Sequence, residues 1–115
     1  MKQQYQILLE SPMGPKKGIL SLKIENPIIT GVFSLLGHDN VLSGILTDTG
    51  EYYLSHTLHS VFCSIPCHSH WKHTQNELFG IIQSAYGNWN CHGTLLGISE
   101  EGIENSAESC SNLSL

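Results

Sequence analysis

The sequence predicts an all-β protein, a single eight-stranded antiparallel up-and-down (meander) β-barrel, and three observations lead to it. A short phrase recurs, in which a glycine precedes a β-branched and then a large apolar residue, with glycines 13 residues apart at Gly18, Gly31 and Gly44 and again at Gly80 and Gly93. Apolar and polar residues alternate with the two-residue period of strands. Glycine, proline, asparagine and aspartate separate these stretches, which is typical of tight turns.

The strands are expected in order at residues 4–10, 17–25, 28–35, 40–48, 52–61, 67–73, 77–84 and 88–97. Every connection is short, so successive strands pair antiparallel. Closing the meander into a barrel removes the exposed edges of an open sheet. Residues 1–98 are expected to form the barrel domain, and residues 99–115, rich in Ser, Glu and Asn, a polar C-terminal tail. A two-sheet sandwich is the alternative architecture.

Length and charge exclude several classes of function. A chain of 115 residues is one domain. Its net charge of −5, with five Lys and no Arg, argues against partners that are nucleic acids or anionic membranes. The start of the chain lacks the apolar run of a secretion signal, and no stretch is apolar enough to span a bilayer. The expected location is therefore cytoplasmic, with reduced cysteines.

The recurring glycine tells which face of each strand is the interior. Side chains two residues apart share a face, and the glycine lies on the more apolar face of five strands, for example with Leu20 and Leu22. The opposite face also carries apolar residues: Ile28, Val32, Val41, Ile45, Phe79, Ile81 and Leu96. This outward apolar band is interpreted either as a surface partly covered by the tail or as a homodimer interface.

Chemically active side chains gather where the phrase is missing, between Gly44 and Gly80, which holds five of the seven histidines. The alternation points Tyr52 and His56 inward on one strand, and Ser69 and Trp71 inward on the next. A few polar groups in an apolar cavity are typical of a small-molecule site. We expect the interior to bind a small, largely apolar ligand through these residues and the apolar side chains of Phe33 and Leu46. The alternative is that they only fill the barrel.

Two other functions stay open at this stage, and whether the chain is an enzyme is left undecided. A barrel-type cyclase or isomerase acting on a small hydrophobic substrate would use His56 as a general acid–base, with Tyr52 as its partner, because an imidazole titrates near neutral pH. A non-catalytic oligomerisation or interaction module would instead use the outward band.

No cofactor and no metal is expected. Cys63, Cys67, His68 and His70 offer zinc-type donors, but a strand directs Cys67 to the face opposite the two histidines. A Cys63–Cys67 disulfide is disfavoured by the expected compartment. The segment 11–18, with Lys16 and Lys17, is interpreted as a hairpin turn with solvated lysines rather than an anion site.

The meander, the short turns and the missing signal together resemble the calycin-type barrels, which include lipocalins, fatty-acid-binding proteins and avidins. The resemblance covers roughly residues 4–97 and lies in pattern only. The lipocalin Gly-x-Trp motif near the first strand is missing, as is the N-terminal helix that would carry it, and no arginine is available for the interior of a fatty-acid binder. Residues 11–22 are also similar to small bacterial β-domains, some of them appended to oxidoreductases. Neither resemblance transfers a site residue.

Overall fold

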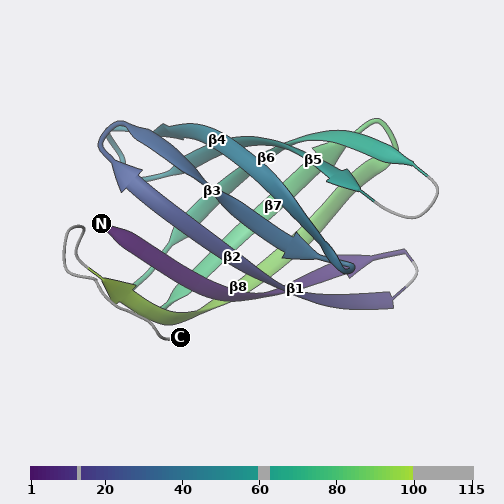
Figure 1. Cartoon of the computed structure of the whole chain (residues 1–115), viewed down its shortest axis with the longest axis horizontal. Helices are drawn as coiled ribbons and strands as arrows, with labels where there is room; N and C mark the ends of the chain where they lie inside the picture. The colour runs from purple at the N-terminus through teal and green to yellow at the C-terminus, as the bar shows by residue number, and fades with distance from the viewer. Residues whose placement is uncertain (13, 60–62, 100–115) are drawn as a thin grey trace.

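The computed structural model describes residues 1–12, 14–59 and 63–99, and they form one closed antiparallel barrel (Figure 1). Each strand pairs with the next along the chain, and β8 pairs with β1 to close the sheet. The order is an up-and-down meander, as the short turns predict. The strands are β1 Lys2–Ser11, β2 Gly14–Glu25, β3 Ile28–Leu35, β4 His38–Leu46, β5 Tyr52–His59, β6 Ser64–His73, β7 Glu77–Ser84 and β8 Gly87–Ser99.

Two turn predictions are wrong in detail. The expected strands 28–35 and 40–48 leave a turn between them, but the structure has a tighter one at Leu36 and Gly37, both with positive φ, so β4 already begins at His38. The turn expected between strands 52–61 and 67–73 includes Ser64–Pro66, but these residues are the start of β6, where Pro66 pairs with Thr57 of β5. The missing N–H of Pro66 is tolerated because the pairing of β6 with β7 begins only at His68.

The interior is the face that the glycine phrase marks. Among the described residues, seventeen buried apolar side chains from all eight strands form one cluster, including Ile7, Leu20, Phe33 and Trp71. The glycines let the barrel close tightly around them. A Cβ at Gly44 would overlap the backbone of β5, and one at Gly80 would overlap the Trp71 ring.

The predicted tail falls largely on residues that the structure does not describe. Ser99 ends β8 and pairs with Lys2, and residues 100–115 lie outside the described part of the chain. In Figure 1 the N-terminus and the end of β8 therefore lie together at one end of the barrel. The connections that follow β1, β3, β5 and β7 lie at the other end, which is called the turn end below.

Candidate functional site

Three of the predicted site residues form a hydrogen-bonded cluster inside the barrel. The indole Nε1 of Trp71 donates to Ser69 Oγ at 2.7 Å, and Ser69 Oγ lies 3.2 Å from His56 Nε2. All three side chains are buried. Phe33, also buried, meets the imidazole edge-on with ring centroids 6.1 Å apart. The alternation of β5 and β6 brings His56, Ser69 and Trp71 together in the interior, and β3 adds Phe33.

His56 is held in its neutral form. Burial removes water from the imidazole, and the nearby His68 disfavours a second positive charge, so the pKa of His56 falls from 6.5 to about 4. Its Nδ1 is buried without a hydrogen-bond partner among the described residues. At neutral pH this imidazole can accept a proton only at a cost, and it has no proton to give as an imidazolium.

Tyr52 and Leu46 lie nearer the end of the barrel that holds the chain's N-terminus. Leu46, Tyr52 and Trp71 are consecutive register partners across β4, β5 and β6. The Tyr52 hydroxyl donates to Gln3 Oε1 at 3.2 Å, and burial raises the pKa of Tyr52 above its ordinary value. Leu46 is half-buried and packs on the edge of the core. Tyr52 therefore belongs to the same wall as Trp71 but points its hydroxyl at β1. A role in binding or catalysis stays a prediction for all six predicted site residues, which are Phe33, Leu46, Tyr52, His56, Ser69 and Trp71.

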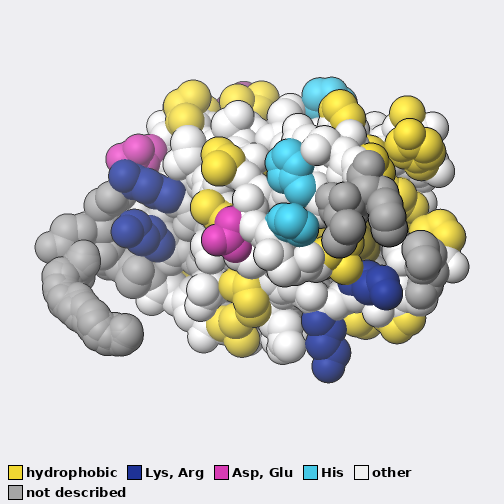
Figure 2. Space-filling view, turned by 45° about the vertical axis from the view of Figure 1, so that its right-hand side comes forward, with side chains coloured by type: hydrophobic (Ala, Val, Ile, Leu, Met, Phe, Trp, Pro, Cys, Tyr) yellow, Lys and Arg dark blue, Asp and Glu magenta, His cyan; other side chains and the backbone are white. Residues whose placement is uncertain are grey.

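An apolar pocket opens at the turn end, and none of the six predicted residues lines it. Its volume is about 280 Å³. The walls come from β1, β2, β3, β5, β6 and β8 and from two turns. We call it the end pocket; its lining residues are Leu9, Ser11, Pro12, Lys16, Leu35, Leu36, Leu58, His59, Ile65 and Trp89. In Figure 2 the turn end is at the right, where hydrophobic side chains gather around the grey atoms and lysines lie below them.

Two of the predicted residues, Phe33 and His56, lie in the layer beneath this pocket. Leu35 lies two residues after Phe33 on β3, and Leu58 two residues after His56 on β5, so each pair shares the inward face. Two residues of a strand span about 7 Å. The floor of the end pocket therefore rests on the layer that holds Phe33 and His56.

Sequence reasoning missed the end pocket because its lining comes from the ends of strands. The sequence pattern predicts a solvated turn residue at Lys16, but this lysine pairs with buried Leu9 and therefore lies on the inward face, where it is half-buried. Trp89 shares the inward face with Cys91 and packs against the core. The alternation carried past the predicted limits of the strands would have placed Lys16 inward.

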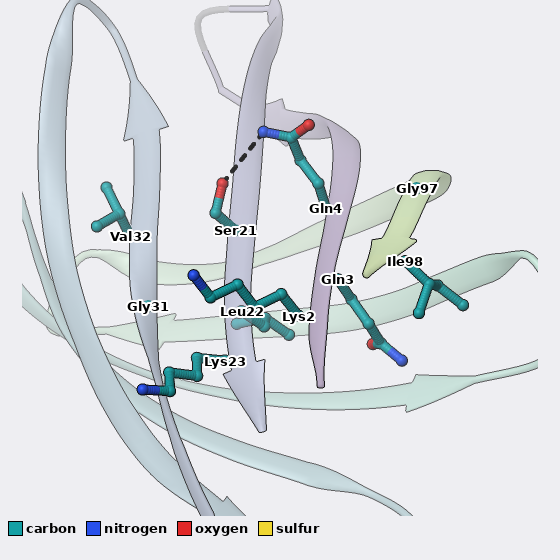
Figure 3. A pocket seen from close by; sticks show the side chains of 10 residues that line it. All are labelled: Lys2, Gln3, Gln4, Ser21, Leu22, Lys23, Gly31, Val32, Gly97 and Ile98. Carbon is teal, nitrogen blue, oxygen red and sulfur yellow. Dashed lines mark hydrogen bonds between the residues drawn. The ribbon is translucent and has the colours of Figure 1, made fainter. Parts of the chain in front are cut away.

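A larger groove, about 540 Å³, lies on the outside of the barrel across β1, β2 and β3 and the end of β8 (Figure 3). Lys2 and Lys23, which are register partners, form one side of it, and Gln4, Ser21 and Val32 form the other. Gln4 donates to Ser21 at 3.4 Å. Long, solvated side chains shape this groove, whereas the barrel itself shapes the end pocket. Because ligands favour preformed, largely apolar concavities, the end pocket is the better candidate despite its smaller volume.

The metal donors considered in the sequence are separated by the barrel wall. Cys67 is a buried free thiol whose pKa burial raises, so the Cys63–Cys67 disulfide is not formed. His68 and His70 face outward and interact with Ser55 and Glu51 respectively. Within the described ranges, no three His, Cys, Asp or Glu side chains are grouped as metal ligands. Nor does the described part of the chain contain a helix that could span a membrane.

Comparison with known proteins adds no relative. No family model, no curated protein and no solved structure matches this chain. The candidate site therefore rests on its geometry alone.

Proposed function

We propose that the protein is a small β-barrel that binds a small, largely apolar ligand, and that the end pocket takes it. The observation that carries this proposal is a concave site built by six strands, with Leu9, Leu35, Leu58 and Ile65 as walls and Trp89 beside them. The closed meander supports a calycin-type architecture. The free thiols Cys67 and Cys91 are in keeping with a reducing, cytoplasmic location.

The size of the pocket limits the ligand. Pockets for drug-sized molecules range from roughly 300 to 1,000 Å³, and the end pocket, at about 280 Å³, is just below this range. Burying each Å² of apolar surface contributes roughly 25 cal/mol, so a compact apolar body gives the most affinity for this space.

Leu36 offers a test that spares the fold. It lines the pocket from the β3–β4 turn, is 50% exposed and has a φ of 56°, a conformation that Asn adopts more readily than Leu. Leu36→Asn should weaken binding of adamantane-1-carboxamide, a compact neutral probe, about threefold to tenfold in isothermal titration calorimetry, with no loss of thermal stability.

Val41→Thr is the matched control, because Val41 is 78% exposed and does not line the pocket. It should bind the probe like the wild type. Equal binding by Leu36→Asn and the wild type, or no binding by either, would contradict the proposal.

Self-association is a second candidate function, favoured by the register of the outer face. Ile28, Ile45, Tyr53, His70 and Ile81 are successive cross-strand partners from β3 to β7. Three isoleucines and one tyrosine of this outward row are each between 44% and 51% exposed. His70 stacks on Tyr53 with ring centroids 4.3 Å apart, which continues the row from β5 to β6. We propose that a second copy covers the outward row.

A further inference from the structure

Lys16 is a charged residue in the largely apolar lining of the end pocket. Its register partner Leu9 is buried, so the lysine begins on the inward face of the barrel, among leucines and beside the Trp89 wall. The next residue, Lys17, is exposed on the outward face, as expected for a solvated lysine. A charged group on an apolar pocket loses part of its hydration and is stabilised by an opposite charge.

The described chain supplies no such charge. No ion pair joins Lys16 to a carboxylate in the part of the chain that the structure describes, and Lys16 is the only lysine or arginine among the pocket's lining residues. The Ser11 hydroxyl donates a hydrogen bond to the carbonyl of Gly14 at 2.7 Å. The pocket thus presents one cation and otherwise mostly apolar walls.

His59 also lines the pocket, at the end of β5, where the alternation from buried Leu58 places its side chain on the outer edge of the rim. Its Nδ1 is 2.8 Å from Ser64 Oγ, and its backbone N–H donates to Asn40 Oδ1. When the Ser64 hydroxyl donates to Nδ1, the neutral imidazole carries its proton on Nε2, and this N–H can donate to a ligand oxygen. Lys16 and His59 would then both address an acidic group at the mouth of the pocket.

We propose that the ligand of the end pocket is a compact apolar acid, whose carboxylate is read by Lys16 at the rim, with His59 as a second donor, while its alicyclic or aromatic body fills the pocket. This inference rests on the proposed function, because it names the class of ligand for the same pocket. The acid binds as the carboxylate, and no covalent step is involved.

Two probes of equal shape test the proposal on the full chain, adamantane-1-carboxylate and the neutral adamantane-1-carboxamide, by isothermal titration calorimetry at pH 7.5. The carboxylate should bind about tenfold more tightly, as a charge-assisted hydrogen bond provides. Lys16→Gln should remove that preference, so that the carboxylate binds no more tightly than the amide. Lys17→Gln, which removes the same charge from the outward face, should keep the preference for the carboxylate. Added salt should weaken the binding of the carboxylate but not that of the amide.

The outcomes separate this inference from the proposed function. If the wild type binds the acid and the amide equally, the proposal of an anionic ligand is overturned, while the proposed binding of an apolar ligand in the end pocket is still supported. If Lys16→Gln and Lys17→Gln lose equal affinity for the carboxylate, the direct contact with Lys16 is overturned, because the net charge of the protein then explains the preference. Binding of neither probe overturns both proposals.

Discussion

At the scale of single residues, the buried His56 makes the stability of the fold sensitive to acid. Its pKa is about 4 in the folded protein and 6.5 when exposed, so between these values the unfolded chain binds more protons. The free energy of unfolding is therefore fully retained above pH 6.5 and falls as the pH drops to 4, by about 3 kcal/mol from this group.

Urea denaturation between pH 7 and pH 4 measures this loss. His56→Leu should flatten the pH dependence, while His38→Gln, at an exposed position, should keep the wild-type slope. An unchanged slope in His56→Leu would contradict burial as the cause of the lowered pKa. The same variant tests the predicted catalytic role of His56.

At the scale of elements, the packing of β6 on β7 depends on a missing side chain. Gly80 and Trp71 are register partners, and a Cβ at Gly80 would overlap the indole ring. Gly80→Ala should lower the free energy of unfolding by about 1–3 kcal/mol, the usual cost of overpacking a core, and should change the near-ultraviolet circular dichroism of Trp71.

Gly97→Ala in β8 is the matched control, since a Cβ there meets nothing within 4 Å. It should cost well under 1 kcal/mol, in the range of ordinary surface substitutions. Equal losses at the two positions would show that the glycines act through backbone propensity rather than through space for Trp71.

The strands and their inward faces could be predicted from the sequence, because burial on one face imposes a period of two. That period correctly placed Phe33, Tyr52, His56 and Trp71 inside the barrel. The end pocket could not be predicted in this way. Its walls combine Leu9, Ile65 and Trp89, and only the register of the closed barrel decides which strand ends meet.

The turns were the least predictable elements for a related reason. Both Gly37 and His38–Asn40 have turn-forming composition, and the pairing of Leu35 with His38 selects the tighter turn. Asn40 is then buried, with its amide donating to the carbonyl of Phe33 and its oxygen accepting from the backbone of His59. A polar residue that serves the backbone of two strands looks like a turn residue in the sequence.

At the scale of the whole molecule, the outward row predicts association of two copies. In size-exclusion chromatography with light scattering, the wild type should show a concentration-dependent dimer. The double variant Ile45→Thr and Ile81→Thr should run as a monomer, because it replaces two exposed isoleucines of the row with residues of similar strand propensity. Leu96→Thr, outside the row, should leave the dimer intact. A wild type that is monomeric at millimolar concentration would contradict this second proposal.

The central claim, that a small apolar ligand occupies the end pocket, is tested most directly by the two indole N–H signals in a nuclear magnetic resonance titration. Trp89 lines the end pocket, whereas the Trp71 N–H is buried in its hydrogen bond to Ser69. With adamantane-1-carboxamide, the Trp89 signal should shift and saturate while the Trp71 signal stays in place. A shift confined to Trp71, or no shift of either signal, would contradict the account.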